Sequence, residues 1–263
     1  MTGPLDGRVA VVTGGSRRGA IGAAVARRLA TDGAKVLVHS WSPYDAEREW
    51  GADAGGPEAL VDEIRASGSD AVHYAADFAD PDTPAAVVQA ARDAYGHVDI
   101  LVANHARSVR QSLEELTAAE IDLSYAVNTR ATLLLIQALA AQHRDERAGG
   151  RVVLFTSGQY HGAMAEELPY MASKAALHEL TPTLAVHLAA RAITVNCVNP
   201  GPNDTGWAEP GVVAESAHHV PGGRWSTPVD TARLVGWLVS DEADWVTGQT
   251  IASDGGWSAL GGI

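Results

Sequence analysis

Tyr170 and Lys174 form the pair of residues best suited to acid–base chemistry in this sequence. They stand four positions apart in Tyr-Met-Ala-Ser-Lys, a spacing that places both side chains on one face of a helix. A free tyrosine has a pKa near ~10, too high for efficient proton transfer at neutral pH. An ammonium beside it in a partly dehydrated cleft would lower that pKa. The pair therefore predicts a proton-transferring tyrosine, although the same spacing also arises by chance on structural helices.

A second chemical feature is the glycine-rich turn Thr-Gly-Gly-Ser-Arg-Arg-Gly-Ala-Ile-Gly, which runs from Thr13 to Gly22. It follows a β-branched apolar run at residues 8–13 and precedes apolar residues at helical spacing. Glycines allow close backbone approach, and a helix N-terminus offers free N–H groups to a pyrophosphate. The turn therefore predicts a nucleotide site. Its position between a strand and a helix makes the alternative, a turn without a binding role, less plausible.

The elements that must position these residues alternate between strands and helices along the whole chain. This alternation predicts a doubly wound parallel sheet, of the α/β class, with helices on both faces and a ligand cleft at the carboxyl ends of the strands. Residues 1–263 are expected to form one domain, with two long connections at residues 41–57 and 200–228. The predicted strands are residues 8–13, 35–39, 71–76, 100–103, 151–156 and 193–198, and the predicted helices are residues 60–66, 85–95, 121–143 and 171–190.

Composition limits the classes of function. The 263 residues are 46% hydrophobic, but no run reaches the roughly 18 apolar residues of a membrane span. The N-terminal residues lack signal-peptide features, so we expect a cytoplasmic protein without a membrane partner. The net charge of −13 argues against a nucleic-acid partner. The single cysteine, Cys197, is expected in the core, and the His218–His219 pair has no third ligand at a recognisable spacing, so we expect no metal site.

The glycine-rich turn resembles the Thr-Gly-x-x-x-Gly-x-Gly fingerprint of the short-chain dehydrogenase/reductase family, with a loop two residues longer, as in its 3-oxoacyl-acyl-carrier-protein-reductase-like members. The Tyr170 motif fits the same family, and the resemblance spans nearly the whole chain. It implies that Ser157 orients the substrate carbonyl, that Asn128 holds a water that passes protons to Lys174, and that Lys174 also binds the cofactor ribose. The catalytic set expected from this resemblance is Asn128, Ser157, Tyr170 and Lys174.

The expected cofactor is NADP(H), with NAD(H) as the alternative. No carboxylate ends the second strand, which reads His39-Ser40-Trp41, and either Arg17 or Arg18 is suited to hold a 2′-phosphate unless both are solvated surface residues. Asp77 resembles the acid at the adenine edge, or else it caps the next helix. The resemblance implies cofactor contacts at Gly14, Ser16, Arg17, Arg18, Gly19, Ile21, Gly22, Ser40, Asp77, Phe78, Asn104, Ala106, Tyr170, Lys174, Pro200, Gly201 and Thr205.

The substrate is expected between the Ser157–Tyr170 loop and residues 200–228. Aromatic and hydrogen-bonding side chains there favour a functionalised organic ketone. The insertion at residues 41–57 is expected either to cover the adenosine end of the cleft or to pack against another subunit. The family resemblance implies a homotetramer. The expected substrate contacts are Gln159, Tyr160, His161, Met164 and Trp207, with His218, His219 and Trp225 as further candidates.

Together these features predict an NADPH-dependent oxidoreductase that reduces a ketone or oxidises the corresponding alcohol. Two alternatives remain open: a family member acting on a C=N or C=C bond, and a catalytically silent NADP-binding regulatory protein. A serine hydrolase is disfavoured because Ser157 lacks a Gly-x-Ser-x-Gly elbow.

Overall fold

The computed structural model describes residues 3–144, 147, 149–208 and 210–260. Its centre is a seven-stranded parallel sheet in the order β3-β2-β1-β4-β5-β6-β7. The sheet order reverses direction between β1 and β4, which is where doubly wound folds open their ligand crevice. The strands are β1 (Val9–Thr13), β2 (Lys35–Ser40), β3 (Ala71–Ala75), β4 (Ile100–Ala103), β5 (Arg151–Phe155), β6 (Thr194–Asn199) and β7 (Thr250–Ala252).

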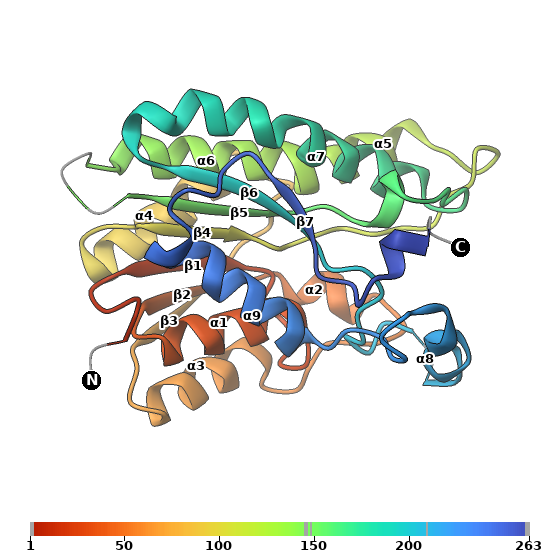
Figure 1. The fold of residues 1–263 in the computed structure, drawn as a ribbon, viewed down its shortest axis with the longest axis horizontal. Coiled ribbons are helices and arrows are strands. Elements are labelled where there is room, and N and C mark those ends of the chain that lie inside the picture. The colour runs from red at the N-terminus through yellow and green to blue at the C-terminus, as the bar shows by residue number, and fades with distance from the viewer. Residues whose placement is uncertain (1–2, 145–146, 148, 209, 261–263) are drawn as a thin grey trace.

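Helices cover both faces of this sheet, in three layers (Figure 1). One apolar core packs α1, α3 and α9 against one face, and a second packs α4, α6 and α7 against the other. The predicted doubly wound α/β fold is therefore confirmed. The helices are α1 (Ile21–Thr31), α2 (Ser42–Ala46), α3 (Gly56–Ala66), α4 (Thr83–Tyr95), α5 (Ala118–Ser124), α6 (Ala131–Gln142), α7 (Leu168–Leu188), α8 (Pro210–Ser216) and α9 (Pro228–Val239).

Three predicted boundaries need correction. The single helix expected at residues 121–143 is interrupted by a π-helical turn, Tyr125–Arg130, between α5 and α6. The two long connections are not structureless, because residues 41–57 contain α2 and the start of α3, and residues 200–228 contain α8. Among the described helices, none has the length and apolar character needed to cross a membrane.

Candidate functional site

A cleft of about 1110 Å³ opens at the carboxyl ends of the strands. Its lining joins the glycine-rich turn, residues 41–50, the loop after β4, the start of α7 and the segment after β6. This volume slightly exceeds the range of about 300–1,000 Å³ found for small-molecule sites. The predicted functional residues that line it are Gly14, Ser16, Arg17, Ile21, Asp77, Phe78, Asn104, Ala106, Ser157, Met164, Tyr170, Lys174, Pro200, Gly201, Thr205 and Trp207.

The glycine-rich turn is packed so closely that side chains are excluded at two positions. A Cβ on Gly14, whose φ is +77°, would lie 2.8 Å from the Asn104 amide nitrogen, and one on Gly22 would lie 2.3 Å from the Gly14 carbonyl oxygen. Asn104 holds the turn by donating to the carbonyl of Thr13 at 3.1 Å. A Cβ on Gly19 would meet nothing within 4 Å. The turn therefore lies open above the N-terminus of α1, which has no side-chain cap.

His39 contacts this turn. From the sequence it was predicted only as the end of a strand. Its ring lies 3.0 Å from the Ala76 carbonyl through Nε2 and accepts from the Gly14 N–H at 3.4 Å through Nδ1. The ring is stacked on Phe78 at 4.0 Å. Burial lowers the pKa of His39 to about 4, so the imidazole is neutral at pH 7 and carries its proton on Nε2. Ser40, expected at the cofactor, instead faces His73 at 2.7 Å and does not line the cleft.

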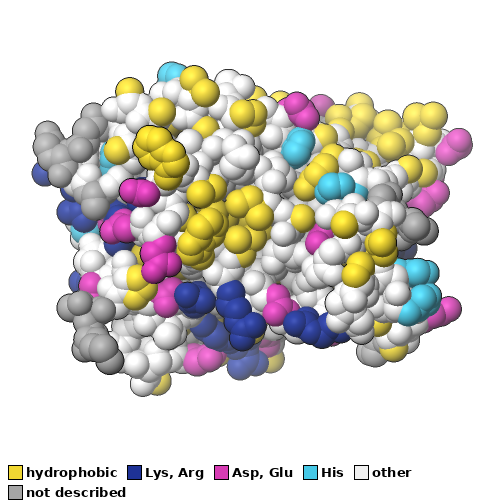
Figure 2. Space-filling view, viewed as in Figure 1, with side chains coloured by type: hydrophobic (Ala, Val, Ile, Leu, Met, Phe, Trp, Pro, Cys, Tyr) yellow, Lys and Arg dark blue, Asp and Glu magenta, His cyan; other side chains and the backbone are white. Residues whose placement is uncertain are grey.

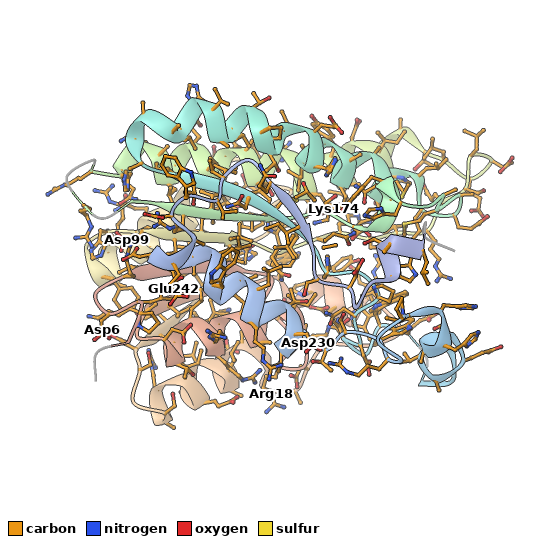
Figure 3. The ribbon with its side chains drawn as sticks, in the orientation of Figure 1. Asp6, Arg18, Asp99, Lys174, Asp230 and Glu242 are labelled. Atoms are coloured by element: carbon orange, nitrogen blue, oxygen red, sulfur yellow. The ribbon has the colours of Figure 1, made fainter. Side chains whose placement is uncertain are left out.

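The two arginines of the turn have different surroundings. Arg17 lines the cleft, and its guanidinium lies 3.4 Å from the Asp45 carboxylate and donates to the Thr205 carbonyl at 3.0 Å. Arg18 does not line it and forms a two-pronged ion pair with Asp53 at 2.9 and 3.0 Å. Arg17 is 19% exposed and Arg18 45%. Figure 3 shows Arg18 at the outer edge of the molecule, away from Lys174.

Tyr170 and Lys174 lie in the N-terminal part of α7, and both line the cleft. Burial, with smaller effects of the Glu167 carboxylate and the Tyr44 phenol, raises the pKa of Tyr170 to about 12, and the Ser157 side chain opposes this rise. Lys174 is 2% exposed and donates to the Phe155 carbonyl at 3.0 Å. Burial lowers its pKa to about 8. Ser157, Tyr170 and Lys174 thus line one cleft, and the groups that shift the pKa of Tyr170 in this structure do not include Lys174.

Asn128 lies in the π-helical turn and is fully buried. Its amide nitrogen donates to the Arg107 carbonyl and the Ser173 hydroxyl, both at 2.8 Å, and its amide oxygen accepts from the Arg107 N–H at 2.7 Å. These bonds tie the loop after β4 to α7, one residue before Lys174. The side chain of Asn128 therefore fixes the backbone around the site.

Several expected contacts lie outside the cleft lining. Arg18, Gly19, Gly22 and Ser40 are absent from it, as are Gln159, Tyr160 and His161. Gln159 folds back to donate to the Thr156 hydroxyl at 2.7 Å. Tyr160 stacks on His178 at 4.4 Å and accepts from Asn199 at 3.3 Å. The further candidates His218, His219 and Trp225 are also absent from the lining.

Residues 41–57 contribute contacts that sequence reasoning missed. The Tyr44 hydroxyl donates to the Ser108 carbonyl at 2.8 Å and accepts from the Ser108 N–H at 2.9 Å, which joins this segment to the loop after β4. Trp50 lies over Arg17 at 5.2 Å and donates to Asp45 at 2.9 Å. The segment therefore lines the cleft between the glycine-rich turn and the loop after β4, and its expected role over the adenosine end of the cleft stays a prediction. The Arg48 guanidinium lies 4.7 Å from the centre of the Tyr44 ring. The four-residue spacing of these two residues is the sequence signal that could have indicated this contact.

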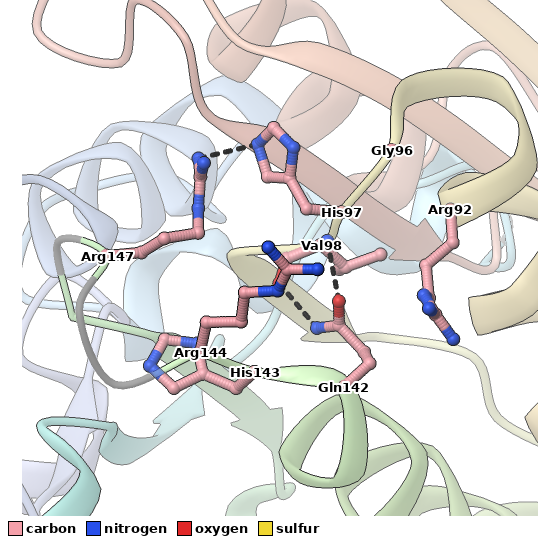
Figure 4. A pocket seen from close by; sticks show the side chains of 8 residues that line it. All are labelled: Arg92, Gly96, His97, Val98, Gln142, His143, Arg144 and Arg147. Carbon is pink, nitrogen blue, oxygen red and sulfur yellow. Dashed lines mark hydrogen bonds between the residues drawn. The ribbon is translucent and has the colours of Figure 1, made fainter.

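A second pocket, of about 230 Å³, lies at the other end of β4, before the strand begins (Figure 4). Its polar groups largely satisfy one another: Arg147 contacts His97 at 2.7 Å, and Gln142 bonds the backbone of Val98 in both directions. Arg147 also pairs with the buried Asp99 at 3.1 Å. None of the expected catalytic residues lines this pocket, so the functional site is the larger cleft.

Comparison with known proteins agrees with this geometry. Residues 14–258 match the family model described as enoyl-(acyl carrier protein) reductase. The chain is 34% identical over 271 residues to a versicolorin reductase of Emericella nidulans, covering 96% of each. It matches a short-chain dehydrogenase/reductase from Serratia marcescens with a TM-score of 0.85 and 32% identity, over 97% of this chain and 99% of that one.

An angucycline C-6 ketoreductase with bound NADP gives a TM-score of 0.85 at 30% identity, with 98% of each chain covered. The family model and the relatives extend over nearly the full chain, and their fold is the one observed. The chain therefore belongs to the short-chain dehydrogenase/reductase family and is an NAD(P)-dependent oxidoreductase.

Proposed function

We propose that this protein is an NADPH-dependent ketoreductase in which Tyr170 transfers the proton. The observation that carries the proposal is that Ser157, Tyr170 and Lys174 line one cleft together with the glycine-rich turn. The ketoreductases among its relatives support the same reaction class. The small-molecule substrate is a ketone in the reductive direction and the corresponding alcohol in the oxidative direction.

The residues present fit a nicotinamide dinucleotide. The uncapped N-terminus of α1 and the open surface at Gly19 suit a pyrophosphate. Asp77 and Phe78 line the cleft beside β3, where an adenine would lie in this fold. The Asp77 carboxylate accepts from the Ala79 N–H at 2.9 Å, so it shapes its own turn and does not cap α4, whose N-cap residue is Asp82. When bound, the cofactor supplies the hydride.

Arg17 is the residue we assign to the 2′-phosphate of NADPH. Its guanidinium faces the cleft and is held on three sides by Asp45, the Thr205 carbonyl and the Trp50 ring. A guanidinium fixed in this way loses little conformational freedom when it binds a phosphate. Arg18 is directed to Asp53 outside the cleft lining and is assigned a structural role. The NADP bound by the angucycline ketoreductase supports this preference.

The raised pKa of Tyr170 suits reduction. A phenol with a pKa of about 12 is fully protonated at neutral pH, and a protonated phenol is the form required to donate to the oxygen of a carbonyl that accepts a hydride. Ser157 donates a second hydrogen bond to the same oxygen and stabilises the negative charge that develops there. Asn128 and Lys174 hold the backbone around these two donors, through Arg107, Ser173 and the Phe155 carbonyl.

Reduction of a C=C bond is the second candidate, because the matching family model is described as an enoyl reductase. The two reactions differ in their product. An enone such as cyclohexenone contains both a C=O and a C=C bond. Reduction of the C=O bond gives an allylic alcohol, and reduction of the C=C bond gives a saturated ketone. The proposed function predicts the alcohol.

The test follows a deuterium label from NADPH. Purified protein is incubated with deuterated NADPH and a panel of ketones and enones, and the products are identified by mass spectrometry. Deuterium on the carbinol carbon supports the proposal. Deuterium on the β-carbon of an enone would assign the protein to C=C reduction, and NADPH binding without any transfer would favour a regulatory protein.

Assembly is a separate part of the proposal. We propose that residues 1–263 form one domain and that the protein assembles as a homotetramer, by family resemblance. Hydrophobic side chains gather on the face formed by α7, β7 and α9 (Figure 2). Val186, Trp237 and Trp245 are exposed on these elements or directly after them. Light scattering of the purified protein tests the subunit number.

A further inference from the structure

Arg48 is a cleft-lining guanidinium whose charge is not matched by an ion pair within the part of the chain that the structure describes. Its Nε is buried and has no hydrogen-bond partner. A buried donor without an acceptor is costly, and a bound water, ion or ligand is one way to satisfy it. Arg48 follows α2, within residues 41–57, and belongs to the same cleft as Ser157 and Tyr170.

Two other arginines of this cleft have carboxylate partners. Arg17 pairs with Asp45, and Arg107 holds Glu120 through two hydrogen bonds of 2.7 and 2.8 Å. Arg110 acts on the Glu167 carboxylate, lowering a pKa that burial raises. Arg48 also lowers the pKa of Glu120, but that carboxylate is already bound by Arg107. Two cations thus act on one carboxylate, and only Arg107 forms an ion pair with it.

Two acids of the same segment, Glu47 and Glu49, also line the cleft. Both side chains are exposed to solvent, where water and salt screen their charge. The Nε of Arg48 is instead shielded from solvent. The two glutamates therefore weaken the field around Arg48 without satisfying its donor.

The contacts of Tyr44 place Arg48 toward the catalytic residues. The Arg48 guanidinium lies 4.7 Å from the centre of the Tyr44 ring. Tyr44 bonds the backbone of Ser108 in the loop after β4, and its phenol is close enough to raise the pKa of Tyr170. A guanidinium supported by an aromatic ring presents its N–H edge in a fixed direction. Arg48 is therefore held by Tyr44 beside the loop after β4, in the cleft that Ser157 and Tyr170 also line.

We propose that Arg48 binds an anionic oxygen group of the substrate, so that the natural substrate is a keto acid whose acidic group is separated from the reacting carbonyl. The inference rests on the proposed function, because it takes the carbonyl to lie at Ser157 and Tyr170. The same chemistry of recognition would also suit the 2′-phosphate of the cofactor. Arg17 and Arg48 thus receive different anions, the first from NADPH and the second from the substrate.

The experiment compares keto acids with their uncharged esters. Levulinate, 5-oxohexanoate and 4-acetylbenzoate are each assayed beside the corresponding methyl ester, with NADPH at saturation. The wild-type protein is expected to prefer the acid in at least one of these pairs. Arg48→Ala should raise the KM for that acid about 10- to 100-fold, the range of a charge-assisted hydrogen bond, and leave the KM for the ester and for NADPH nearly unchanged.

Two matched variants separate the sources of the anion. Arg17→Ala should raise the KM for NADPH without changing the ratio of acid to ester, and Arg18→Ala should change neither. Arg48→Lys should recover part of the acid preference, because it restores the charge without the planar fork. If Arg48→Ala instead raises the KM for NADPH and leaves the acid-to-ester ratio unchanged, Arg48 belongs to the cofactor site and the inference is overturned.

A failure of the proposed function is recognised separately. If no ketone is reduced, binding of the three acids and their esters is measured by calorimetry at saturating NADP⁺. Acids that bind tighter than their esters, with the difference lost in Arg48→Ala, support the anion site even without turnover. Acids that bind no tighter than their esters contradict it, whether or not reduction occurs.

Discussion

The wall of the cleft formed by β5 and α7 differs from the wall formed by residues 41–57 in how its polar groups are satisfied. On the first wall, Tyr170 and Lys174 are removed from solvent. Burial raises the pKa of Tyr170 and lowers that of Lys174, so it favours the neutral form of each side chain. On the second wall, Asp45 and Asp53 are paired with arginines of the glycine-rich turn. The first wall contains the groups that we propose for proton transfer, and the second contains charged groups that we propose for binding the cofactor and the substrate. Substitutions on the first should therefore change kcat, and substitutions on the second should change KM.

The largest effect is expected for Tyr170→Phe. Removal of the proton donor should lower kcat about 10²- to 10⁴-fold, the usual contribution of general acid catalysis. The Kd for NADPH, measured by fluorescence titration, should be nearly unchanged because the ring remains. A variant with near-normal turnover would show that the first wall does not supply the acid.

Arg17→Ala should produce the next largest effect. Loss of a charged hydrogen bond to the 2′-phosphate should raise the KM for NADPH about 10- to 100-fold, with kcat little changed and no effect on the KM for NADH. Arg18→Ala is the control, since its side chain pairs with Asp53 outside the cleft lining. Equal increases in the KM for NADPH in the two variants would contradict the assignment of the 2′-phosphate to Arg17 alone.

Lys174→Met should stabilise the protein while abolishing activity. The folded-state pKa of Lys174, about 8, lies below the ordinary 10.5, so the unfolded chain binds more protons between these pH values. The contribution of this group to the free energy of unfolding therefore rises from pH 8 to 10.5, and below pH 8 the buried ammonium is destabilising throughout. At pH 7 the variant should be more stable by about 1–3 kcal/mol.

Urea unfolding at pH 7 and pH 9.5 measures this difference. The stability advantage of Lys174→Met should shrink at the higher pH, because wild-type Lys174 is then neutral in the folded protein. An advantage that stays constant with pH would point to improved packing by methionine instead.

The smallest effect is expected for Tyr44→Phe on the second wall. The change removes both hydrogen bonds to the backbone of Ser108 and should cost about 1 kcal/mol of stability, since water can replace part of them. Proteolysis within residues 41–57 should become faster, while kcat stays close to wild type. A large loss of kcat would mean that this segment takes a direct part in proton transfer.

Sequence alone was sufficient for the features that depend on local spacing. The alternation of apolar runs predicted the order of strands and helices, and the motif around Tyr170 located the start of α7 near the end of β5. The glycines of the turn were predicted for the correct reason at Gly14 and Gly22, because close backbone approach excludes a Cβ there. The family and the fold that these patterns predicted are confirmed by the observed sheet and by the relatives.

Sequence could not assign partners that depend on distant segments. Arg17 and Arg18 are adjacent, yet the carboxylates that distinguish them come from Asp45 and Asp53, beyond β2. Lys174 was expected to act on Tyr170 from one turn away, but its ammonium donates to the carbonyl of Phe155 on β5. The π-helical turn at Asn128 also lacks a local signal, since its widened geometry is set by tertiary contacts with α7.

Residues 41–57 form a contiguous stretch that touches the glycine-rich turn at one end and the loop after β4 through Tyr44. A single recombination event that exchanged this stretch between relatives would transfer two partners of Arg17, Asp45 and Trp50, together with Arg48. Cofactor preference and substrate preference would then be inherited as one unit. In laboratory evolution, selection for one of these traits within this stretch should change the other at the same time.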